Sequence, residues 1–289
     1  MGRIIGMVKR NVIIFSLITL ASGWFGVLLD RILTEQPEGD TIGMGLWLIL
    51  PLLTALLLRL LGHDWKDTGL RLNLRGNIKW YATAVLIYPI VTLIIVCIGL
   101  LFGWLELAKL KIEISFSLLG TAFLLNLGMK LFEELPWRGY LTPKLIELKQ
   151  KDWQLYIIVG LVWSSWHFAY YMVYLPDSNF ENMSRIGTLL FASVIMIVWS
   201  VMYVELFQIT KSVWPCVLMH AVEDTLFVNT LGLWNSAVVP GKRFLLDLNF
   251  GIISILLFLG FGLLLRKIRI QKEKDENRNY IRGSIMGES

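Results

Sequence analysis

Residues 79–104 read KWYATAVLIYPIVTLIIVCIGLLFGW. After the opening lysine this stretch has no charged side chain, and it is longer than the roughly 20 residues that an α-helix needs to cross a bilayer. It is one of eight apolar segments in the chain, with limits near 11–29, 42–61, 79–104, 114–135, 154–175, 187–207, 213–232 and 247–266. Because a lone segment in lipid must satisfy its own backbone hydrogen bonds, each segment is predicted to be a helix.

The composition favours a membrane protein over a soluble one. Hydrophobic residues make up 56% of the 289 residues and charged residues only 17%, whereas a soluble domain carries about 25% charged residues. The apolar runs do not alternate with polar residues, which argues against a β-barrel. The predicted fold class is therefore all-α: a polytopic membrane protein with about eight transmembrane helices.

The net charge of +5 is better explained by topology than by nucleic-acid binding. Lysines and arginines gather in the N-terminal segment, in the second, fourth and sixth connections, and at the start of the C-terminal tail. These five segments fall on one side of an eight-helix chain, and the positive-inside rule places that side in the cytoplasm. We therefore expect an integral, multi-pass protein with both termini cytoplasmic. The high content of Ile, Leu and Trp points to a bacterial cytoplasmic membrane.

The cysteines and the tail add little chemistry. Cys97 and Cys216 each lie inside an apolar run, so no disulfide framework is expected, and no cysteine pair has metal-ligand spacing. We predict no cofactor and no resident metal. The tail from Gln271 to Ser289 is polar and is predicted to be mobile.

Ionisable residues at the end of the fourth segment are the first that need an explanation. An ionisable side chain at mid-bilayer costs about 2.5–3.5 kcal/mol on insertion scales. Glu134 and Arg138 are four residues apart and can pair on one helix face. Glu133 points about 100° away around the helix and is free for another partner. Pro136 is expected to kink the helix.

Two histidines lie in other apolar segments. His167 ends the run Trp163-Ser-Ser-Trp-His167, and His220 stands four residues before Asp224 on the same helix face. Each motif alone is equally consistent with structural packing. Two glutamates, two histidines and an aspartate on three separate helices together predict one polar cavity inside the membrane.

These motifs resemble those of the CPBP family, which comprises the type II CAAX prenyl endopeptidases and bacterial relatives, including bacteriocin-immunity and abortive-infection-like proteins. The resemblance is carried by Glu133-Glu134-x-x-x-Arg138, Trp163-x-x-x-His167 and His220-x-x-x-Asp224. Trp163 stands where the family usually has Phe, Asp224 stands where its best-studied branch has Asn, and Lys130 is not assigned by the pattern. The chain then divides into N-terminal transmembrane helices (1–117), a CPBP-like protease core (118–233), a last transmembrane helix (234–270) and a polar cytoplasmic tail (271–289).

The resemblance implies a glutamate-dependent intramembrane endopeptidase whose substrate is a membrane-associated peptide or protein, prenylated or not. Its partners would be that substrate and the lipid bilayer, without nucleic acid. Glu133 would be the general base that activates water, helped by His167, and His220 with Asp224 would stabilise the oxyanion. Glu134 and Arg138 would fix the helix end. Since an ionised aspartate would repel an oxyanion, we expect Asp224 to hold His220 protonated, so that His220 donates the hydrogen bond.

Two other classes of protein remain open. A zinc-dependent intramembrane protease could use Glu133, His167 and His220 as ligands, although no His-Glu-x-x-His run is present. A proton-coupled transporter or a non-catalytic scaffold could also bury Glu and His side chains. Straight helices would place His167 roughly 20 Å deep and Glu133 near the cytoplasmic end. One shared cavity therefore requires an offset or a break in the fourth or fifth helix.

Overall fold

The computed structural model describes residues 2–33, 35–37, 41–109, 116–180 and 183–286. These residues are helical or form connections, and within them the only extended pairing is an isolated antiparallel bridge between Leu105 and Val238. The all-α prediction is confirmed.

Every predicted apolar segment overlaps a helix of at least 15 residues. These eight helices are α1 (Gly2–Ile32), α2 (Ile42–Gly62), α3 (Ile78–Leu101), α4 (Phe116–Pro136), α6 (Asp152–Trp166), α7 (Arg185–Thr210), α8 (Trp214–Ala237) and α10 (Ile252–Met286). The remaining elements are short: η1 (Leu107–Lys109), π-helical η2 (Trp137–Leu141), α5 (Thr142–Glu147), π-helical η3 (Tyr170–Tyr174), η4 (Asp177–Phe180) and α9 (Arg243–Leu246).

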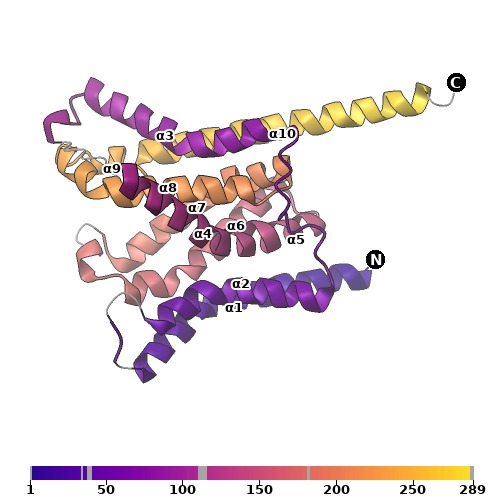
Figure 1. Cartoon of the computed structure of the whole chain (residues 1–289), viewed down its shortest axis with the longest axis horizontal. Coiled ribbons are helices and arrows are strands. Elements are labelled where there is room, and N and C mark those ends of the chain that lie inside the picture. The colour runs from indigo at the N-terminus through magenta and orange to yellow at the C-terminus, as the bar shows by residue number, and fades with distance from the viewer. Residues whose placement is uncertain (1, 34, 38–40, 110–115, 181–182, 287–289) are drawn as a thin grey trace.

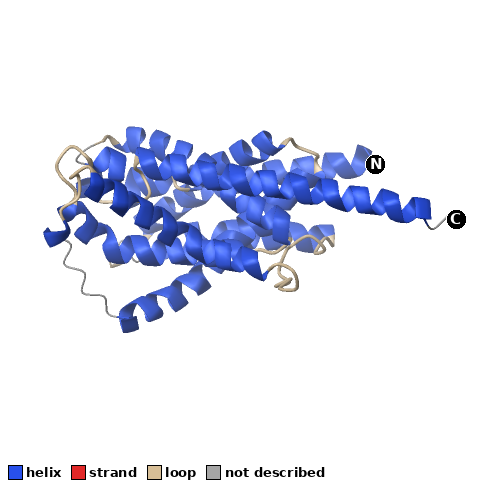
Figure 2. Ribbon diagram, turned by 90° about the horizontal axis from the view of Figure 1, so that it is seen from above, coloured by secondary structure: helices blue, strands red, loops and turns tan. Residues whose placement is uncertain are grey.

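The helices form one bundle with three parts. In Figure 1, α1 and α2 lie along one side, α3 and α10 lie along the other, and α4, α6, α7 and α8 lie between them. The closest helix pairs are α1 with α2, α6 with α7, α7 with α10, and α4 with α8. Both termini emerge at the same end of the bundle, as both views show (Figures 1 and 2). This end also carries α5 and the connection between α2 and α3.

Four helices among the described residues are long and apolar enough to cross a membrane. They are Ile4–Ile32 of α1, α2, α3 and α7. Large apolar side chains on their outer faces are exposed, for example Leu17 at 60% and Leu93 at 61%. Such faces suit contact with lipid tails, and the chain is an integral membrane protein.

The ends of three helices differ from a simple reading of the sequence. Instead of a plain kink at Pro136, α4 passes into the π-helical turn η2 and then into α5. The fifth apolar segment breaks after Trp166, and η3 follows. The tail predicted to be mobile continues α10 as helix to Met286. Pairs four residues apart, such as Arg269 with Glu273, support this helical extension.

Candidate active site

The last turn of α4 and the π-turn η2 bury an ion pair. Nη1 of Arg138 donates to Oε1 of Glu134 at 3.1 Å and lies 3.0 Å from Oε2, and both side chains are fully buried. The guanidinium lies over the rings of Trp163 and Tyr203, at 4.5 and 4.2 Å from their centroids. The predicted pairing of these two residues is therefore present, and it joins α4 to α6 and α7.

Glu133 faces a different set of partners. The Lys130 ammonium donates to Oε1 of Glu133 at 2.5 Å and lies 2.6 Å from Oδ2 of Asp224. Lys130 and Glu133 are almost completely buried, and Asp224 is 28% exposed. One ammonium thus joins the carboxylates of α4 and α8, and it offsets the cost of placing them out of water.

His220 lies between the two glutamates of α4. Its Nδ1 is 2.8 Å from Oε1 of Glu134, and its Nε2 is 3.8 Å from Oε2 of Glu133. Because Arg138 donates to the same Glu134 carboxylate, we assign the proton to Nδ1 of His220. Nε2 is then the nitrogen that faces Glu133, and also Oε2 of Glu223 at 3.9 Å.

The ion pair of Asp224 differs from the pair expected within α8. Among the ion pairs of the described residues, Asp224 binds Lys130, and the closest carboxylate to His220 is that of Glu134. The helical spacing of four residues favoured a pair within α8. The spacing could not show that α4 packs directly against α8. This packing brings Lys130 to Asp224 and the Glu134 carboxylate to His220.

His167 lies at the break that ends α6. It is the C-cap residue of α6, and its Nδ1 donates to the carbonyl of Trp163 at 3.0 Å. Since a carbonyl can only accept, Nδ1 carries the proton and Nε2 keeps a lone pair. The His167 ring lies against those of Trp166 and Tyr170, with centroids 4.6 and 6.2 Å away. The ring of Trp163 contacts that of His220, with centroids 5.6 Å apart, so Trp163 links His167 to α8.

Two further residues of this buried cluster were missed from the sequence. Glu223, on α8, is buried and lies one helical turn after His220, so the spacing of three residues could have revealed it. Asn249, which precedes α10, donates to Oε1 of Glu223 at 2.5 Å. No sequence pattern connects this asparagine with the motifs of α4 and α8.

Two groups of side chains have metal-ligand types close together. His220, Glu223 and Asp224 bring ligand atoms within 4.8 Å of one another, as do Asp64, Asp67 and Glu147. In each group a lysine ammonium already contacts a carboxylate: Lys130 in the first and Lys144 in the second.

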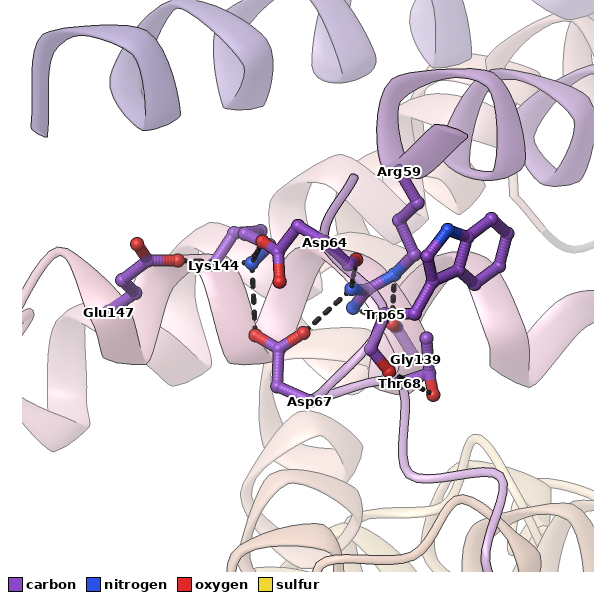
Figure 3. A network of polar contacts seen from close by, with 8 residues as sticks. All are labelled: Arg59, Asp64, Trp65, Asp67, Thr68, Gly139, Lys144 and Glu147. Carbon is purple, nitrogen blue, oxygen red and sulfur yellow. Dashed lines mark hydrogen bonds and ion pairs between the residues drawn. The ribbon is translucent and has the colours of Figure 1, made fainter. Parts of the chain in front are cut away.

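The second group belongs to a polar network at the termini end of the bundle (Figure 3). Lys144 donates to Asp64, to Asp67 at 3.0 Å and to Glu147 at 3.0 Å, while Arg59 donates to Asp67 at 2.6 Å. Burial raises the pKa of the Asp67 carboxyl. The cations of Arg59 and Lys144 lower it by a larger amount, so the pKa lies below its ordinary value. Burial lowers the pKa of Lys144, but its three carboxylate partners raise it above its ordinary value.

The fold and these clusters define an integral membrane protein that buries carboxylates, histidines and cations at the contacts of α4, α6 and α8. Residues 113–226 match the family described as Rce1-like, type II CAAX prenyl endopeptidase Rce1-like. This match over residues 113–226 supports an intramembrane protease of the CPBP family. All six candidate residues lie inside the matched segment, whereas α1, α2 and α3 lie outside it. No curated protein shows a significant match to this chain.

Proposed function

We propose that this chain is a glutamic intramembrane endopeptidase that cleaves a membrane-associated peptide with a water activated by Glu133. The observation that carries the proposal is the position of Glu133. Its carboxylate is held by Lys130 and faces Nε2 of His220, inside the segment that matches the protease family. A positioned carboxylate beside a histidine is suited to general acid–base catalysis.

In the first step, Glu133 accepts a proton from water while the water oxygen attacks the peptide carbonyl carbon. His167 is suited to orient this water, because its Nε2 lone pair is an acceptor. The attack forms a bond to the carbonyl carbon and moves the carbonyl π electrons onto oxygen. The site must therefore offer a hydrogen-bond donor to the new oxyanion.

His220 is our candidate for that donor. Only an imidazolium can donate from both nitrogens. Protonated His220 would donate Nδ1–H to Glu134 and turn Nε2–H towards the space beside Glu133. Glu134, fixed by Arg138, is thus the residue that orients His220, and Asp224 contributes by holding Lys130.

In the second step, the carbonyl re-forms and the carbon–nitrogen bond breaks. Glu133 returns the proton that it took from water to the leaving nitrogen. The products are a carboxylic acid and an amine, and Glu133 is regenerated as the carboxylate. The substrate that we propose is a prenylated CAAX-type peptide or another peptide held at the membrane.

We further propose that all eight long helices cross the bilayer around a polar cavity, with both termini in a bacterial cytoplasm. The common end of the two termini (Figure 1) and the basic residues in its connections support this topology. The helices α4, α8 and α10 carry charged side chains within their length, and α6 has only 15 residues. Their buried partners, such as Glu205 on α7 for Arg269, reduce the cost of that charge.

A zinc-dependent protease is the second candidate, because His220, Glu223 and Asp224 have ligand atoms within 4.8 Å of one another. In that mechanism zinc would replace the Lys130 ammonium as the cation beside Asp224. Dialysis against a chelator distinguishes the two mechanisms. We expect activity to survive chelation, and loss that zinc restores would support the metal mechanism.

The decisive experiment uses the purified full-length protein in detergent with a panel of prenylated and unmodified peptides. We expect Glu133→Gln to lower kcat by at least a hundred-fold, as expected for loss of a general base, with the fold retained. The matched control is Asp177→Asn, which changes a 97% exposed carboxylate and should leave cleavage unchanged. Cleavage by Glu133→Gln at the wild-type rate would reject the mechanism. A cellular phenotype that survives Glu133→Gln would favour a scaffold, and ion-coupled flux in vesicles would favour a transporter.

A further inference from the structure

A groove at the termini end of the bundle is separate from the buried cluster around Glu133. Its volume is about 1220 Å³. Its walls come from the first turns of α1, the end of α2 and the following connection, α5, and the end of α7. None of the six candidate catalytic residues lines it, so the proposed reaction does not account for it.

The charges along this groove are unbalanced. Its three acids, Asp64, Asp67 and Glu147, are all bound to Lys144 or Arg59 (Figure 3). Three more cations line the groove: Lys66, Arg71 and Lys211. Across the described chain no carboxylate comes within 4 Å of the charged nitrogens of these three. The groove therefore offers excess positive charge.

The segment that carries Arg71 is fixed against the end of α7. The carbonyl of Gly69 accepts from the Val213 amide at 2.9 Å, and the indole of Trp214 donates to the Leu70 carbonyl at 2.8 Å. The Asn73 amide donates to the carbonyl of Lys211 at 3.2 Å. Because residues on both sides of Arg71 are bonded to this part of the chain, the groove is built by the fold and holds Arg71 near Lys211.

Exposed apolar side chains also line the groove. Ile4 is 57% exposed, Met7 46% and Trp65 43%, and Leu58 is half-buried. Exposed apolar side chains together with cations that make no ion pair among the described residues fit a ligand that is itself both apolar and anionic. In a membrane protein the molecule with that chemistry at the end of a bundle is a lipid with an acidic headgroup.

We propose that this groove binds one acidic phospholipid. The phosphate contacts Lys66, Arg71 and Lys211, and an acyl chain lies along Ile4, Met7 and Leu58. Two features favour this occupant. The basic connections at this end mark it as the side that faces an anionic leaflet, and basic pockets between membrane helices on that side bind acidic headgroups.

The test uses the full chain in a neutral detergent with phosphatidylglycerol or phosphatidylcholine, and counts bound lipid by native mass spectrometry. We expect the wild type to retain phosphatidylglycerol preferentially. The groove variant combines Lys66→Gln, Arg71→Gln and Lys211→Asn. Each cation near an anionic headgroup contributes roughly five-fold in affinity. The affinity of this variant for phosphatidylglycerol should therefore be at least ten-fold lower than that of the wild type.

A matched control combines Arg75→Gln, Lys267→Gln and Lys149→Asn. These cations are also exposed and make no ion pair in the described structure, and none lines the groove. Lys149 shares with Lys211 a positive φ, 55° against 53°, so both triples place one asparagine in the left-handed region. The control should keep wild-type binding.

Three outcomes would overturn the proposal. An equal loss of bound phosphatidylglycerol in the two triple variants would show unspecific attraction to a basic surface. Equal retention of the two lipids by the wild type would show that headgroup charge is not recognised. Displacement of phosphatidylglycerol by millimolar inorganic phosphate would show that the cations take a free anion. If the groove variant does not remain monodisperse, the proposal is tested by the last two measurements, which need only the wild type.

Discussion

At the scale of single residues, the buried charges of the site depend on Lys130. Its ammonium contacts Glu133 and Asp224, and all three side chains lie between α4 and α8. Removing one member of a buried ion pair leaves an uncompensated charge, which costs roughly 3–5 kcal/mol. We therefore predict that Lys130→Met lowers the free energy of unfolding by about that amount, measured by denaturant or thermal unfolding in detergent.

The Lys130 prediction has an internal control. In a Glu133→Gln background one of the two carboxylates is already neutral, so Lys130→Met should cost less than it does in the wild type. Contacting residues are expected to show such coupling, whereas independent sites are additive. Additive losses would mean that Lys130 and Glu133 do not share their charge in the folded protein.

Asp67 gives a prediction for pH at the same scale. Its carboxyl has a folded-state pKa below the ordinary value of 3.8, chiefly because the Arg59 and Lys144 cations outweigh burial. A depressed pKa stabilises the fold above the unfolded pKa, and this contribution disappears as pH falls through the lower folded value. The melting temperature of Asp67→Asn should thus lie below that of the wild type from pH 7 to about 4. The gap should close under more acidic conditions.

An exposed ion pair serves as the comparison for Asp67. Asp177 pairs with Arg185 at 2.7 Å but is 97% exposed, and such surface pairs contribute little. Asp177→Asn should therefore leave the melting temperature nearly unchanged at every pH. A gap for Asp67→Asn that widens below pH 4 would contradict the assigned direction of its pKa.

At the scale of elements, the π-turn η2 receives hydrogen bonds from outside its own helix. The carbonyl of Gly139 would ordinarily accept from the amide of residue 143, but Pro143 has no N–H. Arg59 of α2 supplies the missing hydrogen bonds, with Nε at 3.1 Å and Nη2 also donating to that carbonyl. The arginine is 98% buried, since its side chain is only 2% exposed. It thus holds the turn that presents Arg138.

We predict that Arg59→Met destabilises the protein more than its lost charge pair with Asp67 explains. A buried unsatisfied carbonyl costs about 1–3 kcal/mol. Pro143→Ala restores a backbone N–H four residues after Gly139, so it should recover part of the loss in the double variant. Unfolding of the single and double variants measures this coupling, and the absence of any rescue would show that the Gly139 carbonyl is not the group that matters.

The sequence predicts elements well where one helix carries the information. The apolar runs locate the eight long helices, and the spacing of four residues predicts the Glu134–Arg138 pair. Prediction from sequence fails where two helices meet, because periodicity within α8 could not show that Asp224 forms an ion pair with Lys130 of α4. Asn249 lies 26 residues beyond its partner Glu223, so its contribution depends on the tertiary path of the chain.

At the scale of the whole molecule, α2 supports both helix breaks of the matched segment although it lies outside that segment. Arg59 holds η2, and Trp47 holds the break at His167. The Trp47 indole donates to the Trp166 carbonyl at 2.8 Å, and the Trp166 indole donates back to the Trp47 carbonyl at 3.0 Å. The Trp47 ring also stacks on Tyr170 and contacts His167 edge-on. These two anchors are about 18 Å apart along α2, so one continuous helix contacts both breaks.

This arrangement predicts that the matched segment does not fold without the N-terminal helices. Residues 116–289 expressed alone should aggregate in detergent, because Trp166, the Gly139 carbonyl and the outer faces of α4 and α6 lose their partners. Co-expression of residues 1–109 as a separate chain should restore a monodisperse complex and peptide cleavage, measured by size exclusion and by the peptide assay.

Trp47→Ala in the 1–109 chain should weaken reassembly at least ten-fold, because it removes a buried aromatic ring whose loss costs roughly 3–5 kcal/mol. Trp24→Ala is the control, since Trp24 meets Phe168 but makes no contact with His167 among the ring pairs of the described residues. A monodisperse and active 116–289 fragment would show that the matched domain positions His167 and η2 by itself, and that α2 only covers them.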